Sequence, residues 1–358
     1  MRKNKLDLEN YSQYINRKWV VLFVLAIGLM VVSLLSLLAG SANMSIKDVI
    51  LALFGKSSRQ MNTIIRNVRL PRLVSALVVG ASLSLSGCIM QNVLRNPLAS
   101  SSTLGVSQGA SFGAALAIIC LDAGSQINTG SASSAALTIT NPYMVSVCAF
   151  LGGMLTTVVI LALSKLRDST PSVMVLAGVA ISSMFTGGTT LLQYFADDVM
   201  VSTIVYWTFG NLGRAGWREI AIIALLSFAS FVFFVSNRWN YNALESGHDS
   251  AKSLGVNTSL LVPFSLAFCA LISSVSVAFT GCISFIGLIA PHIMRRFVGN
   301  DYRFLIPTSA LCGALLLLLA DIACRMIVAP IVLPIGALTS FMGAPLFLYL
   351  IMRQRRAR

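Results

Sequence analysis

The sequence predicts an all-α integral membrane protein with about ten transmembrane helices and both termini in the cytoplasm. Hydrophobic residues make up 56% of the 358 positions and charged residues only 11%. Because a soluble domain carries about 25% charged residues, this composition excludes a soluble protein. The apolar residues gather into ten segments, and both ends of the chain are basic. Basic tails are typical of cytoplasmic ends, and two such ends require an even number of spans.

Each of the ten segments is long enough, or nearly so, to cross about 30 Å of hydrocarbon. The eighth is short and contains Pro291, which predicts a helix that is short or broken near that residue. In chain order the segments are Trp19–Ala39, Leu73–Val93, Thr103–Leu121, Tyr143–Leu163, Val173–Phe195, Trp217–Val235, Leu260–Phe279, Cys282–Phe297, Phe304–Arg325 and Ile335–Met352.

We therefore expect one transmembrane domain over residues 1–358, with cytoplasmic tails at 1–18 and 353–358. Most Lys and Arg residues then fall on the cytoplasmic side, as expected for loops next to spans. The outer segment Ser41–Arg72 is an exception, with a single acid, Asp48. Either the topology is misassigned there, or its basic residues meet lipid headgroups or an acidic partner outside the cell. These residues are Lys47, Lys56, Arg59, Arg66, Arg69 and Arg72.

A polar stretch, Asn237–Asn257, lies between the sixth and seventh segments on the cytoplasmic side. Its second half has the signals of a short helix, with Asp249 near the start and Gly255 as the stop. Ala251 and Leu254, three positions apart, are expected on one side of it. Such a helix is either a solvated part of the loop or a surface that another protein binds.

The second and third segments are rich in Gly, Ala and Ser, which lets helices in a membrane approach closely. Between them lies the polar loop RNPLASSS, starting at Arg95. Irregular polar backbone is tolerated at membrane depth only where protein covers it or it lines a cavity. The loop is a weak indication of a transport pathway.

Several motifs are missing from the sequence. It contains no GxxxxGK[ST] phosphate-binding loop and no Ser–His–Asp nucleophile pattern, so we expect no catalytic activity. His248 and His292 are the only histidines, and the seven cysteines stand singly. We therefore expect no metal site, no cofactor and no disulfide. Membrane topology and anionic lipid explain the net charge of +14 without a nucleic acid partner.

Seven blocks of the sequence resemble one family, the permeases of ABC importers for iron chelates, haem and cobalamin (the FecCD, vitamin B12 permease type). The blocks follow the order of the family over nearly the whole chain. They are RLPR at 69–72, GASLSLSGCIMQNVLRNPLA at 80–99, LGVSQGASFG at 104–113, YWTFGNLGRAGW at 206–217, GHDSAKSLG at 247–255, GCISFIGLIAPHIMRRFVGNDYR at 281–303 and LPIGALTSFMGAPLFLYLI at 333–351.

The resemblance implies a permease subunit that pairs with a second permease subunit around a central pathway in a bacterial cell membrane. Two cytoplasmic ATPase subunits and an extracytoplasmic binding protein complete the importer. The matching positions imply that the loop at 237–257 couples the permease to the ATPase. The residues of this coupling site are Gly247, His248, Asp249, Ala251, Leu254 and Gly255.

The resemblance also implies a docking site for acidic side chains of the binding protein and a gated pathway. The docking residues are Arg69, Arg72 and Arg325. The gate residues are Asn96 at the cytoplasmic end of the pathway and, with a looser match, Ser169, Thr170 and Ser172. The chain departs from the family pattern at Val332, where a glutamate is usual, and at Asp301–Arg303, where Asp-His-Arg is usual.

The favoured function is import of an iron chelate, with haem and cobalamin as alternative cargo and homodimer or heterodimer left open. A proton-coupled secondary transporter is a less favoured alternative. It needs a protonatable group within the membrane, and Asp321 is the candidate. Because Arg325 lies four residues later on the same helix face, a local ion pair is the simpler explanation for Asp321. A membrane scaffold would explain neither the polar loop nor the basic outer segment.

Overall fold

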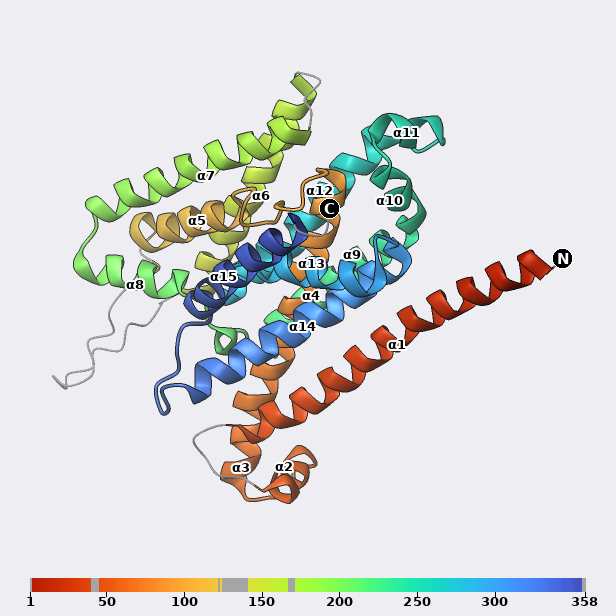
Figure 1. The fold of residues 1–358 in the computed structure, drawn as a ribbon. Coiled ribbons are helices and arrows are strands. Elements are labelled where there is room, and N and C mark those ends of the chain that lie inside the picture. The colour runs from red at the N-terminus through yellow and green to blue at the C-terminus, as the bar shows by residue number, and fades with distance from the viewer. Residues whose placement is uncertain (1, 40–44, 122, 124–140, 167–170, 356–358) are drawn as a thin grey trace, which may run out of the picture.

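The computed structural model describes residues 2–39, 45–121, 123, 141–166 and 171–355, and the regular structure in these ranges is helical (Figure 1). The helices are α1 Arg2–Leu38, α2 Ile46–Leu53, α3 Arg59–Thr63, the π-helix η1 Ile64–Arg69, α4 Leu70–Val93, α5 Val106–Cys120, α6 Pro142–Leu166, α7 Pro171–Tyr194, α8 Asp198–Thr208, the 3-10 helix η2 Leu212–Arg214, α9 Trp217–Ser236, α10 Arg238–Glu245, α11 His248–Ser253, α12 Thr258–Thr280, α13 Ile286–Val298, α14 Tyr302–Met326 and α15 Ile335–Arg355.

The all-α prediction is confirmed, because each of the ten apolar segments coincides with a helix: α1, α4, α5, α6, α7, α9, α12, α13, α14 and α15. Within the described residues, seven helical stretches are long and apolar enough to cross a bilayer, and α5 and α15 are shorter apolar helices. The tail predicted at 1–18 is helical from Arg2 and continuous with α1.

Helix α13 is the short helix that the sequence predicts. Its 13 residues rise about 20 Å, less than the hydrocarbon thickness of about 30 Å. Pro291 lies inside the helix rather than at a break, and the irregular backbone precedes Ile286. Proline cannot bond the carbonyl four residues earlier, which is that of Gly287. The Nε2 of Gln91 on α4 donates to this carbonyl at 3.4 Å.

Helix α4 runs through the middle of the bundle, where α9, α12, α13 and α14 pack around it (Figure 1). Its small residues permit close approach, as the sequence predicts. A Cβ placed on Gly87 would collide with the carbonyl of Gly287 on α13. Helices α1 and α7, in contrast, are covered by few other parts of the chain.

Three segments of the chain meet at one junction, and each segment has a glycine there. The three glycines are Gly210, Gly281 and Gly336. The Asn211 amide donates to the Thr280 carbonyl at 2.7 Å, and the Gly336 amide donates to the Phe209 carbonyl at 2.9 Å. Gly210 and Gly281 have φ values of +73° and +76°, in the left-handed region that favours glycine. The junction joins the end of α8, the end of α12 and the start of α15.

The bundle has two ends. The inner end contains α10, α11 and the α13–α14 turn, and the outer end contains α2 and α3 (Figure 1). The basic tails predict that the inner end faces the cytoplasm. The sequence analysis did not predict the short helices α2, α3, α8 and α10, since each is too short to produce a spanning apolar run.

Candidate functional site at the two ends of the bundle

The coupling segment, residues 237–257, forms two short helices that project from the inner end, α10 and α11 (Figure 1). The predicted helix in its second half is α11. Gly247 precedes it with φ +116°, and Gly255 follows with φ +85°, so glycines delimit both ends. Asp249 lies in the first turn and Lys252 in the last, which suits the helix dipole.

One prediction about this segment is wrong. Ala251 and Leu254 do not share a side: Ala251 is fully buried, whereas Leu254 is 71% exposed. Leu254 is the residue that caps α11, where the chain leaves the helical path, so helical spacing no longer sets its direction. The apolar side chain of Leu254 is therefore exposed, as are the charged side chains of Asp249 and Lys252 near it.

Buried contacts hold the coupling segment against α4. His248 Nε2 lies 3.3 Å from the carbonyl oxygen of Val93, the last residue of α4. One residue earlier, Asn92 Nδ2 donates to the Tyr241 carbonyl at 3.1 Å and to Glu245 at 3.3 Å. The inner end of α4 is therefore tied to both α10 and α11.

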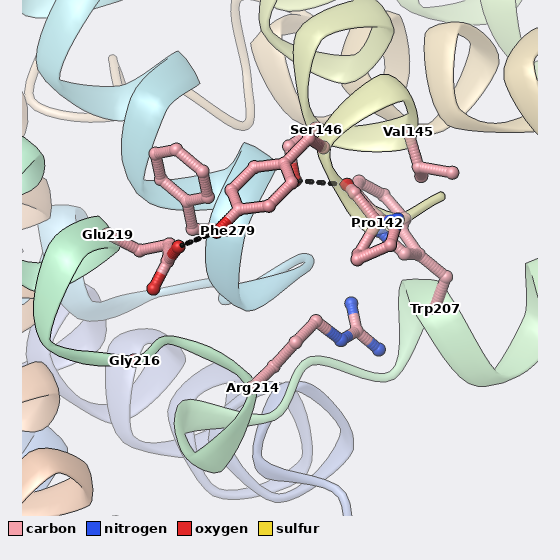
Figure 2. A pocket seen from close by; sticks show the side chains of 9 residues that line it. Pro142, Val145, Ser146, Trp207, Arg214, Gly216, Glu219 and Phe279 are labelled. Carbon is pink, nitrogen blue, oxygen red and sulfur yellow. Dashed lines mark hydrogen bonds between the residues drawn. The ribbon is translucent and has the colours of Figure 1, made fainter. Parts of the chain in front are cut away.

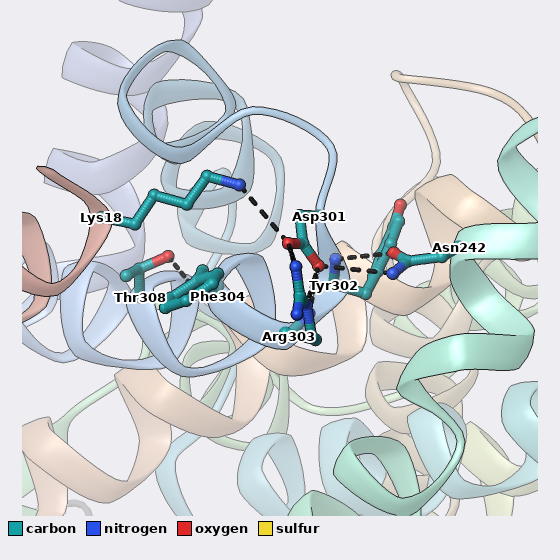
Figure 3. Close-up of polar contacts among 7 residues, drawn as sticks. All are labelled: Lys18, Asn242, Asp301, Tyr302, Arg303, Phe304 and Thr308. Atoms are coloured by element: carbon teal, nitrogen blue, oxygen red, sulfur yellow. Dashed lines mark hydrogen bonds and ion pairs between the residues drawn. The ribbon is translucent and has the colours of Figure 1, made fainter. Parts of the chain in front are cut away.

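A polar junction at Asp301, which the sequence analysis did not identify, joins α10 to α1 and α14 (Figure 3). Asp301 pairs with Lys18 at 3.4 Å and with Arg303 at 2.7 Å, and Asn242 on α10 donates to it at 3.3 Å. Asn242 also accepts from the Tyr302 amide at 2.8 Å. In the sequence, the one signal of this junction is an acidic residue, Asp301, just before a predicted helix.

The charges around Asp301 determine its ionisation. Burial alone would raise its pKa, but hydrogen bonds from Arg303 and Asn242 and the charge of Lys18 lower the pKa to about 2. Lys18 is only 2% exposed and also lies over the rings of Tyr14 and Phe304. Asp301 therefore neutralises a buried cation at the point where three helices meet.

At the outer end, the three predicted docking arginines bind groups of the chain itself. Arg69 is 8% exposed and donates to the carbonyls of Leu37 and Leu38 at the end of α1. Arg72 pairs with Asp321 at 2.7 Å, and Arg325 pairs with the same carboxylate at 3.0 Å. The predicted Asp321–Arg325 ion pair is thus confirmed.

Arg325 also donates to the carbonyls of Ser36 and Ala39, so α1, α4 and α14 are joined at this end. The sequence does not predict these internal contacts of Arg69 and Arg72, because their partners lie far away along the chain. Other basic side chains at the outer end are exposed, and they lie on the short helices and turns between α1 and α4. These residues are Lys47, Lys56, Arg59 and Arg66.

The predicted pathway residues are only partly described. Asn96 is half-buried, and its Oδ1 accepts from the Leu98 amide at 2.9 Å, which fixes the turn after α4. Ser169 and Thr170 lie outside the described residues, and Ser172 is in the first turn of α7.

The polar loop after α4 lines a hollow, as its composition predicts. The hollow has a volume of about 450 Å³ and lies between that loop, α5 and α7. Six of its seven lining residues carry a hydroxyl or a side-chain amide: Ser102, Thr103, Gln108, Ser182, Ser183 and Thr186. Among the described residues, no group of three His, Cys, Asp or Glu side chains could hold a metal ion.

The fold is a multi-pass helical bundle with a protruding loop at one end and a hollow beside α5 and α7. This arrangement is typical of a membrane permease. The model of the FecCD transport family matches residues 28–353. The chain therefore belongs to the FecCD transport family, and it is the permease subunit of an ABC importer rather than its ATPase.

Three relatives and one solved structure are similar over most of the chain. An ABC transporter permease protein of Methanocaldococcus jannaschii is 50% identical over 345 residues, 96% of this chain and 97% of the relative. A hemin transport system permease of Yersinia pestis is 35% identical, covering 93% and 97%. An iron(3+)-hydroxamate import system permease of Bacillus subtilis is 34% identical, covering 99% and 89%.

The solved structure is an inward-facing conformation of a metal-chelate type ABC transporter. It superposes with a TM-score of 0.80 at 29% identity, covering 93% of this chain and 99% of that one. The membership of an ABC importer family implies ATPase and binding-protein partners. The sequence analysis predicts a bacterial cell membrane. An archaeal relative at 50% identity supports a cell membrane location but does not restrict it to bacteria.

Proposed function

We propose that this permease passes an intact ferric chelate from an extracytoplasmic binding protein to the cytoplasm. Two ATPase subunits, which contact residues 237–257, drive the transfer. One observation carries the proposal: Leu254 is 71% exposed on a segment whose other face is anchored in the bundle. An exposed apolar residue on a rigidly held helix suits a protein contact.

Iron chelate is the proposed cargo, with haem and cobalamin as the alternatives. The relatives are named for hemin and for iron(3+)-hydroxamate, so names alone do not choose between them. The hollow beside α7 offers hydroxyl and amide groups and, among its lining residues, no metal-ligating side chain. Such a surface suits a cargo whose metal is already enclosed by its own ligands.

We propose that α7 lines the pathway and that a second permease subunit, identical or related, covers it. Ser183, Thr186 and Thr190 are exposed along α7, and each hydroxyl donates to a carbonyl of the preceding turn. The oxygens keep acceptor capacity that lipid cannot satisfy but a pathway can. Asn96, with Ser169, Thr170 and Ser172, is proposed to form the gates. Cysteine labelling at position 96 should then change with nucleotide state.

For the binding protein, we propose docking on the outer end. Arg69, Arg72 and Arg325 can contribute only if an incoming carboxylate shares or replaces the partners described above. The exposed Lys47, Lys56 and Arg59 are accessible without such an exchange, whereas the exposed Arg66 already donates to the Leu53 carbonyl. They extend the proposed docking surface beyond the three arginines.

The test is reconstitution in proteoliposomes with the partner ATPase and binding protein. Uptake of a ferric chelate should require ATP and both partners and should persist when an ionophore removes the proton gradient. Uptake that needs the gradient and no ATPase would support the secondary transporter instead. The two ion pairs of Asp321 argue against that alternative, since they occupy its one candidate proton carrier.

A further inference from the structure

A second cavity at the outer end has a chemistry that transport of a large chelate does not explain. Its volume is about 290 Å³, and it lies between the start of α6, the end of α8, η2, the start of α9 and the end of α12 (Figure 2). Most of its lining is apolar, from aromatic side chains. The residues that matter for recognition are Arg214, Glu219, Trp207, Tyr143 and Phe279.

Arg214 is the unusual member of this set. Its Nη1 atom is buried without a hydrogen-bond partner, and it forms none of the ion pairs found among the described residues. The guanidinium lies 5.9 Å from the ring of Trp207. Burial lowers its pKa, but an arginine remains protonated at neutral pH. A covered charge without a counter-ion is costly, so the site favours an anion.

The other charged residue that lines the cavity is Glu219, in the first turn of α9. One of its oxygens accepts from the hydroxyl of Tyr143 at 3.1 Å (Figure 2). It forms no ion pair with Arg214 among the described residues, although both line the cavity. Glu219 leaves acceptor capacity for a donor on a ligand, and it disfavours a second negative charge near it.

We propose that this cavity binds a small aromatic carboxylate that also carries a hydroxyl group. The carboxylate would pair with the planar guanidinium of Arg214, which suits bidentate contact. The ring would pack against Trp207 and Phe279, and the hydroxyl would donate to Glu219. The residues that line this cavity differ from those that line the hollow beside α7, so the two sites are separate.

The test is binding to the full chain in lipid nanodiscs by calorimetry, with 4-hydroxybenzoate as the probe, because its hydroxyl lies opposite its carboxylate on the ring. Its uncharged amide, 4-hydroxybenzamide, is the matched ligand control, since it differs only in the charged group. We expect the acid to bind at least tenfold more tightly than the amide. Equal affinities, or no binding of the acid, would overturn the proposal.

Binding measurements on variants of Arg214 test whether the acid binds in this cavity. Arg214→Gln should abolish the preference for the acid, and Arg214→Lys, which keeps the charge but not the planar fork, should weaken it about fivefold. Arg218→Gln, at an exposed arginine in the next helical turn, should change nothing. Equal effects of Arg214→Gln and Arg218→Gln would contradict the site.

A final comparison separates a free carboxylate from an acidic side chain of the binding protein. Arg214→Gln should leave the affinity for the binding protein within twofold of wild type. If it weakened that affinity tenfold and left binding of 4-hydroxybenzoate unchanged, the cavity would be part of the docking surface and the proposal would be wrong. These measurements do not involve transport, so their failure is distinct from failure of the proposed import.

Discussion

The two ends of the bundle use their polar residues in opposite ways. At the inner end, Asn92, Tyr241 and Ala251, which hold the proposed coupling segment against the bundle, are buried, while Leu254 and Asp249 are exposed. At the outer end, Arg69, Arg72 and Arg325 are themselves the residues that hold helices together. The residues proposed to contact a partner therefore differ from the anchoring residues at the inner end, whereas at the outer end the predicted contact residues also anchor.

The largest effect is expected at the inner end. Leu254→Asp should reduce chelate uptake by more than tenfold and leave the protein folded, because it places a charge in an apolar contact with the ATPase without removing a buried group. Asp249→Lys should reduce uptake less. Uptake and ATP hydrolysis are measured together in proteoliposomes.

The control for Leu254→Asp is the same change at Leu121, which is 48% exposed at the outer end of α5. Leu121→Asp should retain wild-type coupling between hydrolysis and uptake. If Leu254→Asp also transported at the wild-type rate, the inner end would have no contact role and the contrast between the two ends would disappear.

The next effect concerns the anchor at Asp301. Asp301→Asn leaves the buried Lys18 without its counter-ion and should lower the free energy of unfolding by about 2–4 kcal/mol. The double variant Lys18→Met, Asp301→Asn should be more stable than Asp301→Asn alone, since it leaves no unpaired buried charge. Thermal unfolding in nanodiscs measures both. A less stable double variant would argue against an ion-pair anchor.

A smaller effect is expected at the exposed basic residues of the outer end. Arg59→Glu and Lys56→Glu should weaken docking of the binding protein about two- to fivefold each at low salt, as expected for exposed charge pairs worth ~0.5–1 kcal/mol. The protein should remain as stable as wild type. Affinity is measured at two salt concentrations.

Arg72→Gln is the matched variant for this comparison, since Arg72 pairs with Asp321 inside the bundle. It should lower stability more than it lowers docking affinity. A large loss of docking with unchanged stability would show that Arg72 is primarily a contact residue, and it would remove the difference between the two ends.

The smallest effect is the pH dependence of the inner anchor. Because the pKa of Asp301 is lowered to about 2, its stabilising contribution is complete above the ordinary aspartate pKa and is lost only as the pH falls through about 2. The stability difference between wild type and Asp301→Asn should therefore be equal at pH 5 and pH 8. A difference that shrinks at pH 5 would mean that the carboxylate titrates near neutral pH.

The sequence predicts the helices of this fold well because each spanning helix produces its own apolar run. It also predicts α11, whose two glycines and end charges are local signals. It fails where the partner is distant: Arg72 meets Asp321, 249 positions later, and Lys18 meets Asp301, 283 positions later. It also misjudges Leu254, because a helix cap changes the direction of a side chain that helical spacing places beside Ala251.

The junction of Gly210, Gly281 and Gly336 has a consequence for the biogenesis of the protein. The ribosome makes Phe209 more than a hundred residues before it makes Gly336, yet the carbonyl of the first accepts from the amide of the second. During synthesis, this carbonyl must therefore remain without that donor until α15 is made. The last helix to be inserted completes the outer half of the bundle, so a chain truncated before Ile335 should expose unpaired backbone to lipid and be recognised by membrane proteases.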